Sequence, residues 1–187
     1  MEFTHLHVHT EYSLLDGSNK IKEYVARVKE LGMDSAAITD HGVMYGVIDF
    51  YRAARAEGIN PILGCEVYVA PGSRFDREAG SGEDRYYHLV LLAENNQGYA
   101  NLMKIVSKGF TEGFYYKPRV DLAVLKEYHE GIIRLNVPAL QVRLPDIFRE
   151  ACMRMTKAAA LRYQDIFWKK AISSWNYRIM EFLRRDW

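Results

Sequence analysis

The stretch FTHLHVHTEYSLLDGSNKIKEYVARVKELG, residues 3–32, decides the fold class that this sequence predicts. Apolar and polar residues alternate over its first part, FTHLHVHT, which is typical of an extended strand. Its last part, IKEYVARVKELG, places apolar side chains on one helical face and stops at Gly32. A strand followed by a helix is the unit from which parallel sheets and barrels are built.

The same unit returns further along the chain. Three more apolar runs are typical of buried strands: SAAITDHG (residues 35–42), INPILGCEVYVA (residues 59–70) and YYHLVLLAEN (residues 86–95). Helical patterns follow two of these runs, in GVIDFYRAARAEG (residues 46–58) and around YANLMKIVSKG (residues 99–109). Residues 71–85 are rich in Gly, Ser and charge and predict an exposed loop. The sequence therefore predicts an α/β fold with a parallel sheet or barrel.

Composition restricts the classes of function. The chain has 187 residues, of which 49% are hydrophobic, as in ordinary globular domains. A net charge of +1 provides no field that would draw the whole molecule to a membrane surface, and it predicts only weak, local contact with nucleic acid. The start MEFTHLHVHT lacks the features of a signal peptide, and no apolar run approaches a membrane span, so we expect a cytoplasmic protein. Cys65 and Cys152 are far apart in the sequence, and no disulfide is expected.

Three histidines alternate in the first predicted strand. His5, His7 and His9 would project to one side of that strand, with Leu6 and Val8 on the other. Two neutral imidazoles within reach of one ion are a common metal-binding arrangement. The pair His7 and His9 therefore favours a metal site.

Further candidate ligands stand near the ends of the predicted strands: Asp16, Asp40, His41, Glu66 and His88. In parallel α/β folds the carboxyl ends of the strands meet at one edge, so these side chains can converge if Glu66 and His88 point inward. Singly, each has an ordinary explanation, because Asp16 before Gly17 is typical of a turn and one histidine in a strand is usually a satisfied polar residue. Their joint occurrence on successive strands favours a common site.

Five segments carry a resemblance to a known family: HLHVHTEYSLLDG, AITDHGVMYGVIDFY, GCEVYVAP, YYHLVLLAEN and GFTEGFYYKPRVD. They closely resemble the PHP (polymerase and histidinol phosphatase) domain of bacterial replicative DNA polymerase III alpha subunits, over residues 1 to about 133. The runs between the metal motifs match this polymerase branch rather than the stand-alone phosphatases. The resemblance implies a distorted (β/α)7 barrel, incomplete in this chain.

The resemblance also implies a metal cluster. In the family the barrel holds up to three divalent ions (Zn²⁺, Mn²⁺ or Mg²⁺), and fewer are expected here. The implied ligands are His7, His9, Asp16, His41, Glu66 and His88. His5 lies beside the first pair and is expected to support the ligands rather than to bind metal itself.

The resemblance divides the chain into a partial barrel, residues 1–133, and a tail, residues 134–187, that departs from the family. Where the family continues with three more ligands, this chain reads RLNVPALQVRLPDIFREACMRMT, residues 134–156. KAAALRYQDIF, residues 157–167, then resembles the family again. Compensating shifts of reading phase in the gene would produce such a family-like segment between two segments that depart from the family. Divergence into amphipathic helices is the alternative.

The residues and the resemblance together predict a metal-dependent phosphoesterase module linked to DNA replication, with no catalytic residue beyond the cluster. Bound divalent ions lower the pKa of a bridging water and stabilise charge on a phosphate. Lys117 and Arg119 are candidates to contact a substrate phosphate, although KPR, residues 117–119, is also typical of an exposed basic turn.

The resemblance implies partners for the full-length parent, namely DNA and the other replicase subunits. The carboxylates that perform nucleotidyl transfer in that parent are not expected in this chain, so polymerase activity is not predicted. With three ligands missing, we expect slow hydrolysis and marginal stability. Two alternatives stay open: a structural, partner-binding module with a vestigial metal site, and a stand-alone PHP phosphatase.

Overall fold

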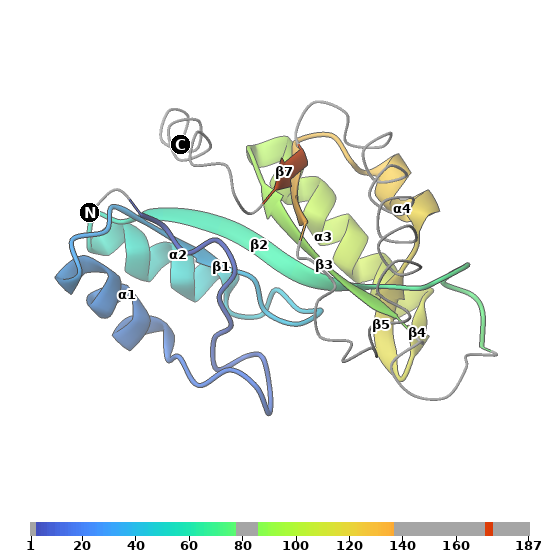
Figure 1. Ribbon diagram of the computed structural model, residues 1–187, viewed down its shortest axis with the longest axis horizontal. Helices are drawn as coiled ribbons and strands as arrows, with labels where there is room; N and C mark the ends of the chain where they lie inside the picture. The colour runs from blue at the N-terminus through green and yellow to red at the C-terminus, as the bar shows by residue number, and fades with distance from the viewer. Residues whose placement is uncertain (1–2, 78–85, 137–170, 174–187) are drawn as a thin grey trace, which may run out of the picture.

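The computed structural model describes residues 3–77, 86–136 and 171–173 (Figure 1). The elements in these ranges are α1 (Ile21–Glu30), β1 (Ser35–Ile38), α2 (Val47–Ala56), β2 (Asn60–Val69), β3 (Tyr87–Ala93), α3 (Asn96–Thr111), β4 (Phe114–Tyr115), β5 (Lys117–Val120), α4 (Leu122–Glu127), β6 (Ile132–Asn136) and β7 (Ala171–Ser173). The strands form one sheet of seven. The α/β class is confirmed, and α1, α2 and α3 lie where the sequence predicted helices, whereas α4 was not predicted.

Strand β2 organises the sheet and runs along much of the described molecule (Figure 1). Its first half pairs in parallel with β1, and its last two residues pair in parallel with β5. Strand β3 lies antiparallel to β2, and β6 lies antiparallel to β3. The sheet is therefore mixed, and the prediction of parallel order is wrong for β3. The described residues between β2 and β3 contain no crossover helix, and antiparallel neighbours need none.

The two faces of the sheet carry different side chains because residues alternate along each strand. On one face, Cys65, Val67 and Val69 of β2 pack with residues of α3 and α4. The opposite face holds a smaller cluster that includes Ile62 of β2 and Val90 of β3. Glu66 and His88 share the strand parity of Ile62 and Val90. The helices therefore cover one face and leave these polar side chains on the other.

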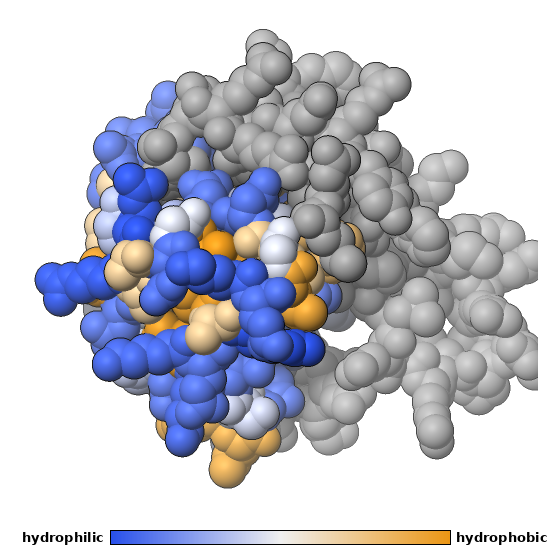
Figure 2. Space-filling model, turned by 90° about the vertical axis from the view of Figure 1, so that its left-hand side faces the viewer, coloured by the Kyte–Doolittle hydropathy of each residue, from blue (hydrophilic) through white to orange (hydrophobic). Residues whose placement is uncertain are grey.

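Helices α1 and α2 pack near the amino end of β2. The face of α1 that the sequence predicted to be apolar is buried through Ile21, Val25 and Val28, against Val47 and Phe50 of α2. The hydroxyl of Tyr24, on the same helix, donates a hydrogen bond to Ala37 O in β1. The outer face at this end is mostly hydrophilic, with hydrophobic side chains gathered near its centre (Figure 2).

The first histidine segment departs from its predicted form. Residues 3–9 lie outside any strand, although an extended strand was predicted there. The main chain of Val8 is nevertheless fixed, because Val8 N donates to Thr39 Oγ1 (2.8 Å) and Thr39 N donates to Val8 O (2.9 Å). These bonds hold the segment beside the end of β1 without a regular ladder.

The predicted boundary at residue 133 falls inside β6, and β6 pairs in parallel with β7. Residues 137–170 and 174–187, which make up most of the predicted tail, lie outside the described residues. The division at residue 133 and the shift of reading phase stay predictions. Across the described ranges, no helix has both the length and the apolar character that a membrane crossing requires.

Candidate metal centre

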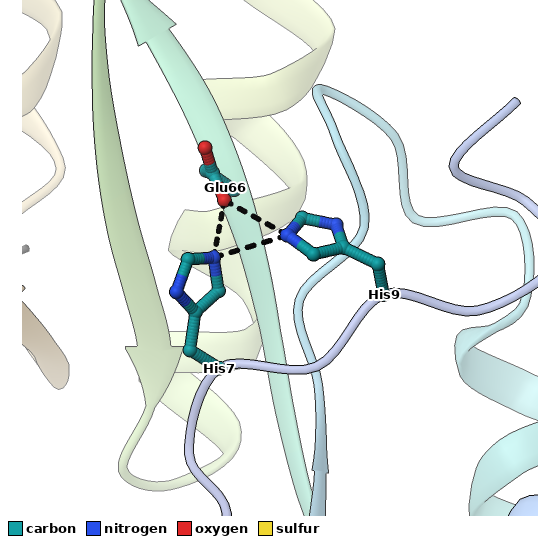
Figure 3. A group of neighbouring side chains, drawn as sticks. All are labelled: His7, His9 and Glu66. Atoms are coloured by element: carbon teal, nitrogen blue, oxygen red, sulfur yellow. Dashed lines mark hydrogen bonds and ion pairs between the residues drawn. The ribbon is translucent and has the colours of Figure 1, made fainter. Parts of the chain in front are cut away.

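The carboxylate of Glu66 lies at the centre of the candidate site. Glu66 is 3% exposed and stands in the middle of β2, on the face away from α3. One of its oxygens, Oε2, contacts His7 Nε2 and lies 3.1 Å from His9 Nε2. Figure 3 shows these two rings directed at the carboxylate. The other oxygen, Oε1, contacts His88 Nδ1 and lies 3.5 Å from His41 Nδ1.

Strand pairing brings His41 and His88 to Glu66. His41 follows β1 and forms a parallel bridge with Glu66, whose main-chain N donates to Asp40 O at 3.0 Å. His88 lies opposite Tyr68 on the antiparallel strand β3, one diagonal step from Glu66. The predicted convergence is therefore confirmed. The predicted reason is wrong for His88, which stands at the amino end of its strand and reaches the site because β3 runs antiparallel.

The loop from Thr10 to Gly17 supplies Asp16. Its carboxylate oxygen Oδ2 lies 2.7 Å from His41 Nε2. The loop closes tightly, because a Cβ atom at Gly17 would lie 2.0 Å from the main-chain oxygen of Thr10. Only glycine avoids that clash, so the Asp-Gly pair that resembled an ordinary turn also positions a site residue.

Three overlapping groups of side chains could each hold a metal ion: His7, His9 and Glu66; His9, Asp16 and His41; and His41, Glu66 and His88. In each group the potential ligand atoms lie within 4.8 Å of one another. The six side chains predicted as ligands are the six that form these groups. His5 belongs to none of them, is exposed, and packs edge-on against Phe3 with ring centroids 4.7 Å apart.

The surroundings shift the pKa values of these groups in opposite directions. Burial would raise the pKa of Glu66, but hydrogen bonds from the surrounding histidines outweigh it and hold that pKa well below its usual range. Burial lowers the pKa of His9, yet the hydrogen bond to Glu66 and its charge reverse the sign, and the pKa of His9 is raised. For His41 burial prevails and the pKa is lowered. The hydrogen bond with His41 lowers the pKa of Asp16.

One buried atom tests whether these residues fit a cation. His41 Nε2 faces the acceptor oxygen of Asp16, so Nε2 carries a proton and the neutral ring has its lone pair on Nδ1. His41 Nδ1 is buried, makes no hydrogen bond and lies 3.5 Å from Glu66 Oε1. A lone pair facing a carboxylate is unfavourable unless a positive charge lies between them. The residues therefore fit a cation.

The two basic candidates have different surroundings. Arg119 is 1% exposed, and its guanidinium donates to the main-chain oxygens of Asp76 (2.6 Å), Arg74 (3.4 Å) and Gly113 (3.4 Å). These contacts give Arg119 a structural role and do not favour its predicted contact with a substrate. Lys117 is exposed, and its Nζ lies 5.4 Å from the ring centroid of Tyr68.

Tyr68 borders the cluster and was missed in the sequence. Its ring lies 5.1 Å from that of His88 and 6.2 Å from that of His41, between centroids. Burial raises the pKa of Tyr68 to about 12. An apolar run on a buried strand contains no signal for this role, because it shows only that the residue is inside.

Ser13 and Thr10 were also missed, and Asp40, one of the further candidate ligands at a strand end, belongs to none of the three groups. The three form a buried hydrogen-bond network under the cluster. Serine and threonine in a polar loop usually indicate a turn. Their contact with a residue about 30 positions later in the chain has no local signature in the sequence.

The fold and the site define an α/β protein with a candidate centre for divalent cations. Residues 5–173 match the PHP domain family, and the chain belongs to that family. Its relatives include the DNA polymerase III subunit alpha of Treponema pallidum, 47% identical over 167 residues that make up 89% of this chain and 14% of the relative. The corresponding Helicobacter pylori subunit (strain 26695) is 53% identical over 131 residues, 70% of this chain and 11% of the relative. The chain thus spans about a seventh of the length of such relatives.

Two solved structures also show similarity. One is a protein from Bifidobacterium adolescentis assigned as a metal-dependent phosphoesterase, with a TM-score of 0.38 and 21% identity over 57% of this chain and 34% of that one. The other is an amidohydrolase from Chromobacterium violaceum, with a TM-score of 0.38 and 25% identity over 56% of this chain and 34% of that one.

Proposed function

We propose that this chain is the metal-holding part of a phosphoesterase site, in the PHP region at the amino end of a replicative DNA polymerase alpha subunit. One observation carries the proposal. The buried carboxylate of Glu66 lies among four imidazoles, and one of these, from His41, directs an unpartnered buried nitrogen at it. Structural polar clusters normally satisfy their buried atoms, so this arrangement favours a cation site.

The donor set indicates the class of ion. Imidazole nitrogen suits Zn²⁺ and other transition metals, whereas Mg²⁺ prefers oxygen ligands. We therefore favour Zn²⁺ over Mg²⁺, and we place Mn²⁺ between them because it is a transition metal that prefers oxygen ligands. His7, His9 and Glu66 would hold one ion, and Asp16, His41 and His88 would complete neighbouring positions. When bound, such ions activate water and stabilise the charge of a phosphate.

The proposed substrate is a phosphoester, and Lys117 is proposed to bind its phosphate. The lysine is exposed and lies above Tyr68, whose ring contacts the rings of His41 and His88. Its positive charge therefore lies beside an aromatic ring that borders the cluster. DNA and the other replicase subunits are the proposed partners of the full-length protein, by similarity to the polymerase subunits.

Metal analysis and an activity assay test the proposal together. Purified protein is loaded with Mn²⁺ or Zn²⁺, its metal content is measured by elemental analysis, and hydrolysis of bis(p-nitrophenyl) phosphate is followed. We expect bound metal and slow hydrolysis, both lost in His9→Ala. His129→Ala is the matched control, because His129 is exposed after α4 and bonds to Lys126 O.

Each outcome of this assay has a distinct meaning. Metal content in His9→Ala equal to that of the parent would refute the metal site. Metal bound in the parent without hydrolysis would favour the structural, partner-binding module. Turnover equal to that of a full-length relative would show that six ligands suffice, against the expected loss of about 10²–10³ in rate for a missing charge-stabilising contact.

A further inference from the structure

The buried carboxylate of Asp40 lies beneath the cluster, and both of its oxygens accept hydrogen bonds from the loop of residues 10–17. Asp40 is 1% exposed and belongs to none of the three candidate metal groups. Its Oδ1 accepts from Thr10 N (2.6 Å) and from Ser13 Oγ (2.8 Å), and its Oδ2 accepts from Thr10 Oγ1 (2.7 Å). Asp40 therefore connects the end of β1 to the loop that follows His9.

Ser13 links this carboxylate to two candidate ligands. Its Oγ lies 2.8 Å from Asp40 Oδ1, 3.0 Å from His41 N and 2.9 Å from His9 Nδ1. Ser13 itself is 1% exposed, so these three contacts occupy the hydroxyl.

A count of protons decides the direction of each bond. A hydroxyl has one proton to donate and two lone pairs. An ionised carboxylate can only accept, so the Ser13 proton goes to Asp40. The main-chain N of His41 can only donate, and it takes one lone pair. The remaining lone pair faces His9 Nδ1, which must therefore carry a proton.

The alternative arrangement is unfavourable. If Ser13 donated to His9 Nδ1, its oxygen would direct a lone pair at Asp40 Oδ1 from 2.8 Å. Only a protonated Asp40 could relieve that repulsion, and its carboxylate already accepts two hydrogen bonds from Thr10. Both carboxylate oxygens of Asp40 are therefore already occupied as acceptors.

We propose that Asp40 and Ser13 form a positioning pair that keeps a proton on His9 Nδ1 and so reserves His9 Nε2 for a cation. The inference rests on the proposed function, because it says how one ligand of that site is prepared. His9 Nε2 lies 3.1 Å from both His7 Nε2 and Glu66 Oε2, and an ion bound there would replace the second proton that Nε2 shares with Glu66 in the metal-free protein. Supporting groups that fix the tautomer of a metal-binding histidine commonly strengthen its binding.

The same serine organises a whole candidate group. The amides of Asp16 and Gly17 donate to Ser13 O at 3.0 and 2.7 Å. Its hydroxyl fixes the His9 ring and the main chain of His41. His9, Asp16 and His41 are together one of the three groups that could hold an ion. Ser13 therefore positions every member of that group while binding no ion itself.

Nitrogen NMR of the imidazole rings tests the inference directly. The metal-free full chain, labelled with ¹⁵N in histidine, is measured at a pH where the rings are neutral, and His9 is assigned by comparison with His9→Ala. We expect His9 Nδ1 to carry a proton, whether or not Nε2 also shares one with Glu66. A parent spectrum in which Nδ1 is unprotonated and the His9 proton lies on Nε2 alone would overturn the proposal, whatever the variants do.

Ser13→Ala removes the acceptor, and Ser18→Ala, an exposed serine in the same loop, is the matched control. We expect Ser13→Ala to populate both tautomers of His9 and to bind Mn²⁺ or Zn²⁺ about 10–100-fold more weakly, as is typical of lost supporting bonds. The control should match the parent in both measurements. Retention of the single tautomer and of full affinity in Ser13→Ala would overturn the role of Ser13.

The two readouts separate this inference from the proposed function. Nδ1 protonation in the parent, without metal binding by any form of the protein, would support the orientation of His9 and overturn the metal site. If Ser13→Ala fails to fold, which a thermal melt would reveal, the spectrum of the parent still decides the direction of the hydrogen bond.

Discussion

Replacement of Glu66 by glutamine keeps the size of the side chain and removes the negative charge at the centre of the cluster. Without metal, the carboxylate contacts four imidazoles, and a hydrogen bond to a charged group contributes about 1.5–3 kcal/mol to stability. The side chains of His7 and His88 are 37% and 41% exposed, so solvent screens part of this contribution. We expect Glu66→Gln to lower the free energy of unfolding of the metal-free protein by about 1–2 kcal/mol.

The effect on metal binding should be larger. Glu66 belongs to two of the three candidate groups, so its loss weakens two positions at once. Loss of a mere supporting residue typically costs about 10–100-fold in affinity, and we expect at least about 100-fold here. Unfolding in urea measures the first effect, and competition with a metal indicator for Mn²⁺ or Zn²⁺ measures the second.

A matched control excludes a general effect of lost charge. Glu23 on α1 has a side chain that is 74% exposed, and Glu23→Gln should change neither measurement. An unchanged metal affinity in Glu66→Gln would refute the reasoning, because it would show that the carboxylate of Glu66 does not help to hold the ion.

Three further outcomes are expected. Arg119→Ala should lower the free energy of unfolding in urea by at least about 2 kcal/mol, because it leaves buried carbonyls unpaired. Lys117→Ala should keep the stability of the protein and weaken phosphoester hydrolysis. The reverse pattern would assign the substrate contact to Arg119. Gly17→Ala should cost about 1–3 kcal/mol and weaken metal binding, since its Cβ would overlap Thr10 O at 2.0 Å, and equal melting temperatures would contradict this. Folding lowers the pKa of Glu66, so its contribution to stability is present above its ordinary pKa of 4.5 and is lost as the pH falls toward the folded value. Glu66→Gln should therefore make the stability of the metal-free protein depend less on pH in the acid range. An unchanged pH dependence there would argue against this role of Glu66.

The positions of α1, α2 and α3 and the set of candidate ligands could be predicted because both have local signatures. The apolar face of α1 repeats with the helical period, so its burial through Val25 and Val28 follows from the sequence alone. The alternating His7 and His9 indicate metal chemistry through their residue type and spacing, even though their segment is not a strand. The resemblance to PHP domains added the remaining candidate ligands, and the structure brings all six side chains together.

Long-range pairing decided what the sequence could not. The direction of β3 depends on how the connection after β2 returns, and it places His88 at the site from the amino end of its strand. The burial of Arg119 depends on the carbonyls of Arg74 and Asp76, which reach it from a distant part of the chain.

The sequence by itself determined the α/β class and the set of side chains able to bind metal, because the periodicity of apolar residues and the chemistry of imidazole and carboxylate are properties of short segments. Only the tertiary structure decided which nitrogen of His9 faces the site. That choice requires Asp40, Ser13 and His9 to meet, and the hydrogen bond between Ser13 and Asp40 joins residues 27 positions apart. The direction of a hydrogen bond follows from the donors and acceptors that surround it, and folding alone assembles them.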